Sequence, residues 1–226
     1  MAASPLFVTF EGIEGSGKSL QLSLLKAEME RRRAPCVFSR EPGGTRFGER
    51  VRDILLSHDG VEREPLAELL LYLADRHQHL REVVEPALAR GFHVVSDRYH
   101  DATLAYQGHA RGIGFAKIDR LAAILELRRP DLTLVLDVDV EVGLRRARVR
   151  NREQSSQRLG RFESEETAFH ERVREGYRLL AEREPDRILH VDGSGAPEDV
   201  FRRVLPILEA GGAFEVKRRE ARSDTP

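Results

Sequence analysis

The chain has 226 residues, of which 33% are charged, and a formal net charge of −1 at pH 7. This length fits one α/β domain with a large core, and the balanced charge excludes a general basic field for nucleic acid or a membrane surface. The single cysteine, Cys36, excludes an internal disulfide, and we expect it to pack as a small core residue. With no apolar run of transmembrane length and no signal-peptide pattern, we expect a cytoplasmic protein.

Short apolar runs of β type alternate along the chain with longer helical patterns. The predicted strands are 6–10, 36–39, 93–96, 132–138 and 187–191. The predicted helices are 19–33, 46–57, 65–90, 115–127, 140–150, 163–184 and 197–209. This order predicts an α/β fold with a five-stranded parallel sheet and helices on both faces. Ligands of such sheets bind beyond the carboxyl ends of the strands.

We predict a single domain over residues 1–210 and a disordered tail over 211–226, because the tail is first rich in glycine and then charged. His77 and His79 lie two positions apart on a predicted helix and diverge. We therefore expect both imidazoles to be exposed, and we expect no metal site formed by histidines.

The segment after the first predicted strand matches the phosphate-binding pattern G-x-x-x-x-G-K-[ST]. This phosphate-binding loop consists of Gly12, Ile13, Glu14, Gly15, Ser16, Gly17, Lys18 and Ser19. Its glycines let the backbone N–H groups surround a polyphosphate, and the helix that follows adds a favourable dipole. We expect Lys18 to reach the β- and γ-phosphates and the Ser19 hydroxyl to ligate Mg²⁺. The alternative is an ordinary glycine turn between a strand and a helix.

Charged residues also follow the second and third predicted strands. Asp97 is our candidate for holding the metal or its water shell, and we favour it over Asp137 because the adjacent Arg98 supplies a phosphate-binding fork. Arg40 begins the turn Arg-Glu-Pro-Gly-Gly-Thr and is a candidate for a second phosphate. The alternatives are a strand-end cap or ion pair at Asp97 and a surface turn with a local salt bridge at Arg40.

Arginine is unusually dense toward the end of the fifth predicted helix and just beyond it. The residues are Arg145, Arg146, Arg148, Arg150, Arg152, Arg158 and Arg161. Together with the polar loop 154–157 they predict a lid over residues 145–163 that closes on phosphates. Phosphoryl transfer needs a cation at the transferring group, which loop positions 13–16 lack, so we expect the lid to supply it. The alternative is a solvated basic helix followed by a loop.

These motifs, in this order over residues 6–209, resemble the thymidylate kinases of bacterial type. The resemblance is carried by 10–19, 40–45, 97–99 and Ala105-Tyr106-Gln107-Gly108, with a weaker marker in Phe162-Glu163. It implies a three-layer P-loop NTPase fold, phosphorylation of dTMP to dTDP with ATP and Mg²⁺, and a homodimer. No nucleic-acid or membrane partner is expected.

The resemblance also implies roles for single residues at the acceptor base. Tyr72 falls where the family stacks an aromatic ring on thymine, although it also reads as a core aromatic on an apolar helix stripe. Arg76 falls where an arginine bonds the base carbonyl, and Thr103 and Gln107 fall at base-contacting positions. Tyr106 falls where a ring crowds the 2′ carbon of the sugar and disfavours ribonucleotides.

Further roles concern the phosphates. Arg40 and Arg98 align with arginines near the dTMP phosphate, and Glu11 aligns with an acidic residue near the acceptor sugar and phosphate. The family's bacterial members carry the catalytic arginine in the lid, where Arg161 is the best aligned and Arg152 the next. Gly160 stands where the family often has Asp before this arginine, and the lid loop is longer than in short-lid members. The implied catalytic set is Lys18, Arg98, Arg161, Arg152 and Glu11, and adenine is expected near the backbone of 192–194.

Two other functions compete with this interpretation. Another nucleotide or nucleoside kinase would share the fold but would lack the base-contacting set described above. A GTPase-like switch would carry a guanine-reading Asn-Lys-x-Asp run, which the sequence lacks.

Overall fold

The structure, a computed structural model, describes residues 4–57, 61–153 and 165–214, with residues 151–153 described by their backbone alone. Its centre is a five-stranded sheet in the order β2-β3-β1-β4-β5, with every neighbouring pair parallel. The strands are β1 (Phe7–Glu11), β2 (Cys36–Arg40), β3 (His93–Asp97), β4 (Leu132–Asp137) and β5 (Ile188–Asp192). All five coincide with predicted strands to within a residue at each end, so the predicted sheet is confirmed.

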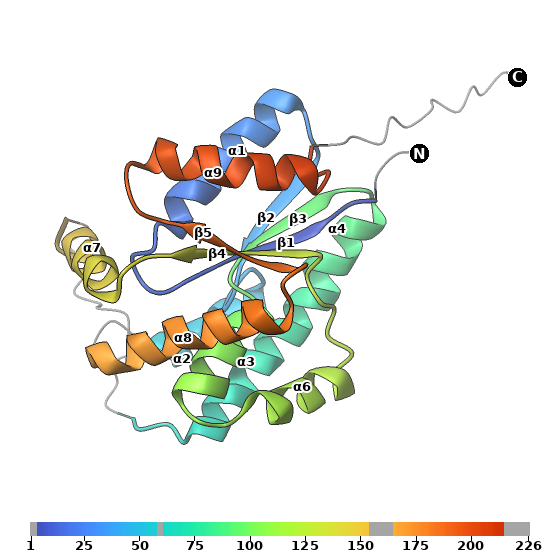
Figure 1. Cartoon of the computed structure of the whole chain (residues 1–226). Coiled ribbons are helices and arrows are strands. Elements are labelled where there is room, and N and C mark those ends of the chain that lie inside the picture. Colours follow the sequence, from blue (N-terminus) through green and yellow to red (C-terminus); the bar gives the residue numbers. More distant parts are fainter. Residues whose placement is uncertain (1–3, 58–60, 154–164, 215–226) are drawn as a thin grey trace, which may run out of the picture.

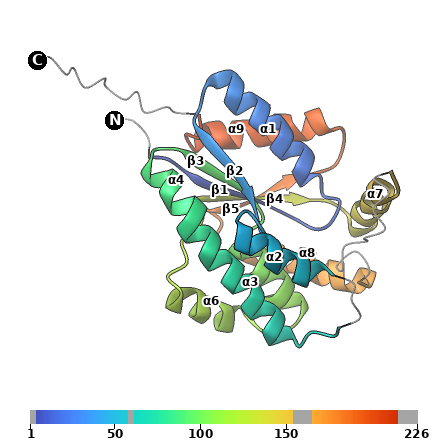
Figure 2. The same cartoon turned by 180° about the vertical axis from the view of Figure 1, so that it is seen from behind.

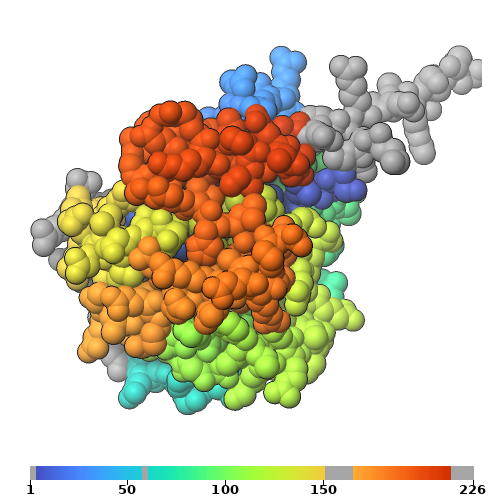
Figure 3. Space-filling model, in the orientation of Figure 1, coloured from blue at the N-terminus to red at the C-terminus, as the bar shows by residue number. Residues whose placement is uncertain are grey.

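Helices cover both faces of the sheet and complete three layers. They are α1 (Lys18–Arg32), α2 (Arg46–Leu56), α3 (Pro65–His79), the π-helical turn η1 (Leu80–Val84), α4 (Glu85–Ala89), α5 (His100–Thr103), the π-helical turn η2 (Leu104–Ala110), α6 (Phe115–Ile124), α7 (Val140–Glu153), α8 (Thr167–Arg183) and α9 (Pro197–Ala210). α1 and α9 lie together on one face, and α3, α4 and α8 lie on the other (Figures 1 and 2). In the space-filling view α9 and α8 form neighbouring bands, with α7 beside one end of α8 (Figure 3).

The strands next to the middle of the sheet are buried on both faces, as the continuous apolar runs of the sequence require. Val8 and Phe10 of β1 pack with Leu25 of α1 and Val204 of α9 in one apolar cluster. A second cluster on the other face joins Tyr177 and other residues of α8 to residues of α3 and η2. Each such apolar side chain stabilises the fold by about 1.5–3 kcal/mol.

The helical segment formed by α5 and η2 is not among the predicted helices. This segment packs closely on α8 at Gly176, where an added Cβ would lie 3.1 Å from the Cα of Ala105. A close contact with a glycine requires no large apolar side chain. It therefore adds nothing to the periodic apolar pattern from which the helices were predicted. The predicted helix over 65–90 is continuous in the structure, with η1 between α3 and α4.

Two further expectations change. His79 is wholly buried, so its expected exposure is wrong, while His77 is half-buried. Residues 211–214 continue from α9 onto the domain: Ala213 is buried, and the guanidinium of Arg32 lies 4.1 Å from the centre of the Phe214 ring. Residues 211–214 of the predicted tail therefore pack on the domain, and the rest of the predicted tail lies outside the described residues.

Cys36 is half-buried against the cluster beneath α1 and α9, which agrees with its predicted packing role. Burial raises the pKa of its thiol to about 12. None of the helices in the described part of the chain has the length and apolar character needed to cross a bilayer.

Each strand ends on a charged residue at the same edge of the sheet. These residues are Glu11, Arg40, Asp97, Asp137 and Asp192. The first strand of the chain, β1, lies in the middle of the sheet. β2 and β3 lie on one side of it and β4 and β5 on the other, so the direction in which strands are added reverses at β1. Parallel sheets bind ligands at this kind of switch point.

Candidate active site

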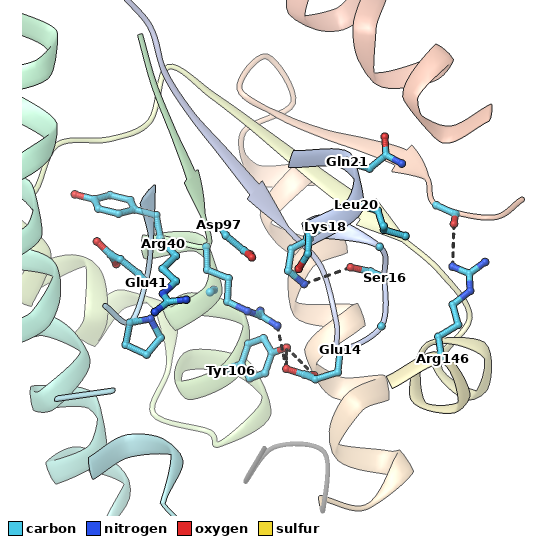
Figure 4. A pocket seen from close by; sticks show the side chains of 18 of the residues that line it. Glu14, Ser16, Lys18, Leu20, Gln21, Arg40, Glu41, Asp97, Tyr106 and Arg146 are labelled. Atoms are coloured by element: carbon cyan, nitrogen blue, oxygen red, sulfur yellow. Dashed lines mark hydrogen bonds and ion pairs between the residues drawn. The ribbon is translucent and has the colours of Figure 1, made fainter. Parts of the chain in front are cut away.

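A cavity of about 850 Å³ opens beyond the carboxyl ends of the strands. Its lining joins the phosphate-binding loop to the segments after β2 and β3 and to residues of α3, η2 and α7. Figure 4 shows Lys18 and Ser16 near its middle, Arg146 toward one side, and Arg40 and Glu41 toward the other. One cavity thus holds the predicted nucleotide loop and the predicted acceptor residues.

The phosphate-binding loop is closed around the ammonium group of Lys18. Lys18 Nζ donates to the carbonyl oxygens of Gly12 and Ile13 at 2.9 and 3.1 Å, and to Ser16 Oγ at 3.3 Å. Burial and the nearby Arg98 lower the pKa of Lys18 to about 8. Loop residues 14–19 line the cavity, whereas Gly12 and Ile13 act through these carbonyl groups from behind it.

The loop is also packed against α7 in a way the motif does not reveal. Gly15 has a φ of +71°, and an added Cβ would lie 1.9 Å from the carbonyl oxygen of Gly143 on α7. A Cβ on Gly143 would in turn lie 2.7 Å from the carbonyl oxygen of Glu14. Gly143 is therefore a site residue that sequence reasoning missed, because its role is to leave space.

Glu14 of the loop binds the side chain that was expected to hold an acceptor phosphate. Arg98 Nη2 and the Tyr106 hydroxyl each donate to Glu14 Oε1 at 2.9 Å, and His170 Nδ1 lies 3.2 Å from Oε2. Burial alone would raise the pKa of Glu14, but Arg98 and His170 lower it to about 2. Glu14 is therefore ionised, and it forms an ion pair with Arg98.

Arg98 has a left-handed backbone, with a φ of +68°. Its N–H donates to the carbonyl oxygen of Phe10 at 2.9 Å, and the Ser96 hydroxyl donates to its carbonyl oxygen at 2.8 Å. A non-glycine residue in this region carries strain that surrounding bonds must hold, and such positions cluster at functional sites.

Asp97 and Ser19 both line the cavity. Asp97 Oδ1 is buried and has no hydrogen-bond partner within the described ranges. The competing carboxylate, Asp137, is held by two bonds from Arg174, at 2.6 and 2.9 Å. A buried carboxylate oxygen without a partner, facing a cavity with a hydroxyl group, fits a hard cation such as Mg²⁺.

Apart from Glu11, the residues that the resemblance assigned to the acceptor nucleotide line this cavity. They are Arg40, Tyr72, Arg76, Arg98, Thr103, Tyr106 and Gln107. Gln107 Nε2 donates to Glu68 Oε1 at 3.0 Å, which fixes the amide. Arg76 is almost completely buried beside Tyr99, with its guanidinium carbon 5.1 Å from the ring centre.

Three further arginines line the cavity. Arg52 of α2, which sequence reasoning missed, donates to the carbonyl oxygen of Pro42 at 2.7 Å, and burial together with Arg40 lowers its pKa. Its only sequence signal is its place on the helix after the Pro-Gly-Gly turn. Arg146 and Arg150 come from the predicted lid, and Arg146 Nη1 donates to the carbonyl oxygen of Gly193 at 3.2 Å. Gly193 lines the cavity within the segment where adenine was expected.

The remaining predicted residues lie elsewhere. Glu11 is buried outside the cavity lining, where it accepts hydrogen bonds from the Tyr99 backbone at 2.8 Å and the Tyr177 hydroxyl at 2.7 Å. Burial raises its pKa to about 7. Through the bond from the Tyr99 N–H, the Glu11 carboxyl group supports the backbone at the start of α5. The side chain of Arg152 and the whole of Arg161 lie outside the described residues.

The comparisons with known proteins agree with this geometry. The thymidylate kinase family model matches residues 10–204. A thymidylate kinase of Pelobacter propionicus is 48% identical over 200 residues, covering 88% of this chain and 91% of that protein. One of Desulfosudis oleivorans is 46% identical over 206 residues, covering 90% and 96%. The crystal structure of a thymidylate kinase from Ehrlichia chaffeensis superimposes with a TM-score of 0.72 at 30% identity, covering 91% of this chain and all of that one. The chain belongs to the thymidylate kinase family.

Proposed function

We propose that this enzyme transfers the γ-phosphoryl group of ATP to dTMP and so forms dTDP, a precursor for dTTP synthesis. The observation that carries the proposal is the single cavity whose lining joins residues 14–19 of the phosphate-binding loop to the residues expected to bind the acceptor base and phosphate. The family membership supports the choice of dTMP as the acceptor.

At the donor end, backbone N–H groups of residues 14–19 and the start of α1 hold the ATP phosphates. Lys18 exchanges its bonds to loop carbonyl groups for bonds to the β- and γ-phosphates, and the dense negative charge keeps it protonated. Arg146 and Gly193 lie on this side, where the purine of ATP enters.

At the acceptor end, Arg40, Arg52 and Arg98 converge on the place of the dTMP phosphate. The phosphate takes over the positive charge of Arg98, which pairs with Glu14 in the structure. Tyr72 lies against the base, Arg76 and Gln107 meet its polar edge, and Tyr106 crowds the 2′ position of the sugar. These contacts align the attacking oxygen with the γ-phosphorus, which is the main requirement of this chemistry.

Asp97 and Ser19 are the residues that would hold Mg²⁺. The ion, when bound, neutralises charge on the β- and γ-phosphate oxygens. Asp97 contributes a buried carboxyl oxygen that has no hydrogen-bond partner among the residues described.

The proposed reaction also needs a positive charge at the transferred phosphoryl group, and we assign this role to an arginine of the lid. Arg161 is our first candidate and Arg152 the second. Arg161→Ala should lower kcat by about 10³-fold or more with little change in ATP binding. A wild-type rate in this variant would remove Arg161 from the chemistry and leave Arg152 to be tested in the same way.

We also propose a homodimer that acts in the cytoplasm, as the family resemblance implies. Exposed apolar side chains on the adjoining helices α2 and α3 support the dimer: Phe47, Ile54, Leu66 and Leu70. Apolar side chains gathered on one exposed surface are typical of protein interfaces.

The test is an acceptor panel with ATP and Mg²⁺. Release of ADP should depend on dTMP and be much slower with AMP, GMP, CMP and dCMP. Turnover with another monophosphate but not with dTMP would show that the enzyme is a different nucleotide kinase. ADP release independent of any acceptor would indicate an NTPase or a switch protein.

A further inference from the structure

A buried ion-pair network lies behind the base end of the cavity. Glu41, Arg76 and His79 are 3%, 1% and 0% exposed. Arg76 Nε donates to Glu41 Oε2 at 2.8 Å, and the other Glu41 oxygen lies 2.7 Å from His79 Nδ1. His79 Nε2 lies 2.6 Å from the hydroxyl group of Ser39 on β2. A chain of close polar contacts therefore runs from the sheet through Glu41 to Arg76.

The side chains of Arg76 and His79 come from the same face of α3, because the two residues are three positions apart. Asp75 adds a third link, since both of its oxygens accept from the Gly43 N–H at 3.2 Å. Three side chains of α3 thus hold the turn that follows β2. Two of them, Arg76 and His79, each contact one oxygen of Glu41 and so fix its carboxyl group.

The geometry fixes the guanidinium group of Arg76. Its Nη2 donates to the carbonyl oxygen of Tyr99 at 2.9 Å, so two nitrogens are held by two separate segments. The third nitrogen of the guanidinium, Nη1, is buried without a partner in the described parts of the chain, and Arg76 lines the cavity. Because a guanidinium is planar and can only donate, holding two nitrogens also fixes the direction in which the third donates.

We propose that Glu41 and His79 are positioning residues that set the choice of pyrimidine base by acting through Arg76. The inference rests on the proposed function, in which Arg76 meets the acceptor base. Thymine presents a carbonyl oxygen at position 4, whereas cytosine presents an amino group there. A fixed N–H donor bonds the first and confronts the second with another donor, which leaves both groups unpaired and makes discrimination large.

A merely structural ion pair predicts a different result. If Glu41 only stabilised the turn, its loss would reduce stability or impair all acceptors by the same factor. If Glu41 positions Arg76, its loss changes the ratio of kcat/KM between dTMP and dCMP, which differ at positions 3 and 4 and in the 5-methyl group. Contributions from N3 and the 5-methyl group that do not depend on Arg76 are the same in every variant and cancel from the change in this ratio.

The first experiment uses Glu41→Gln, with Glu28→Gln as the matched control. Glu28 is a carboxylate on α1 that bonds two arginines outside the cavity lining. In E41Q we expect the preference for dTMP over dCMP to fall about tenfold or more and the KM for dTMP to rise about tenfold. The KM for ATP and the kcat at saturating dTMP should stay close to wild type, and E28Q should change none of these values.

The second experiment compares two replacements of His79. Asparagine places a polar group near the position of Nδ1 and can keep the contact with Glu41, whereas glutamine reaches the position of Nε2 and keeps only the contact with Ser39. We expect H79N to preserve the base preference and H79Q to lower it. In an Arg76→Met background, adding E41Q should have no further effect on the ratio, since the residue through which Glu41 acts is absent.

An E41Q enzyme with the wild-type ratio, or one impaired equally with both acceptors, overturns the inference. If E41Q does not fold, as judged by circular dichroism and thermal unfolding, the H79N and H79Q pair decides by the same ratio. The wild-type enzyme is assayed first with dTMP: lack of turnover there would overturn the proposed function, a result distinct from an unchanged ratio in the variants.

Discussion

Lys18 carries the charge on which the donor end of the cavity depends. Burial and Arg98 lower its pKa to about 8, so in the free enzyme the cation is complete well below pH 8 and is lost as the pH rises through that value. We therefore expect kcat/KM for ATP to fall above about pH 8, because this parameter reports the free enzyme. The kcat at saturating ATP should not follow, since bound phosphates raise the pKa again. Initial rates over a pH series measure both parameters.

Lys18→Arg is the control for this profile. Arginine keeps its charge throughout the range, so the variant should lose the alkaline limb even though its activity is lower. A fall with the same midpoint in K18R would assign the pH dependence to another group.

Asp97 offers a second test at this scale. Asp97→Asn removes the charge that would hold Mg²⁺, so we expect the Mg²⁺ concentration for half-maximal rate to rise about tenfold or more. Asp137→Asn is the matched control, because its carboxylate is already held by Arg174 and should affect stability but not the metal dependence. Equal shifts in the two variants would contradict the assignment.

Residues that belong to motifs could be predicted because their spacing along the chain encodes their place in the site. Asp97 ends β3, Arg98 follows it, and Lys18 belongs to the loop after β1. The parallel sheet places the carboxyl ends of all five strands at one edge. Arg52 and Gly143 could not be predicted, because their roles arise where separate elements meet. His79 looked exposed for the same reason: the helix pattern does not reveal that Glu41 covers it.

At the level of elements, α7 and the phosphate-binding loop act as one packed unit. Gly143→Ala would place a Cβ 2.7 Å from the carbonyl oxygen of Glu14 and so displace the loop. We expect the KM for ATP to rise about tenfold, because a small misplacement of groups that hold a reactant is costly. Steady-state kinetics with ATP varied measures this effect.

Gly176→Ala on α8 is the matched helical control. Its Cβ would press on Ala105, in the segment that carries Tyr106 and Gln107, rather than on the loop. This variant should raise the KM for dTMP and leave that for ATP near wild type. The opposite pattern in the two variants would contradict the assignment of α7 to the donor end.

The elements that could be predicted are those whose apolar pattern is unbroken. The five strands are continuous apolar runs, and the long helices show a regular apolar stripe, so both could be recognised locally. The segment formed by α5 and η2 is short, and it is held against α8 through Gly176. Its stability comes from a contact between distant parts of the chain, which local patterns do not encode.

For the whole molecule, oligomerisation is the property that the pattern of a single chain reveals least. Leu66 and Leu70 of α3 are 42% and 52% exposed, and Ile54 of the adjoining helix α2 is 49% exposed. If these residues form the dimer interface, Leu70→Glu should bury a charge without a partner and shift the protein toward monomer. Light scattering after size-exclusion chromatography measures the mass.

Val149→Glu is the control, since Val149 is an equally exposed apolar residue of α7, at 49%. This variant should retain twice the mass of one chain. A monomeric wild-type protein, or an L70E variant that remains dimeric, would contradict the proposed interface.

The packing of Cys36 has a practical consequence for watching the enzyme at work. With a pKa near 12, this sulfhydryl is almost entirely protonated at neutral pH and reacts poorly with maleimide dyes. A second cysteine at an exposed position, such as Val149→Cys, should therefore take up a fluorophore selectively without any need to mutate the native one. Fluorescence from that single label would report in real time whether α7 senses the arrival of ATP, the arrival of dTMP, or both.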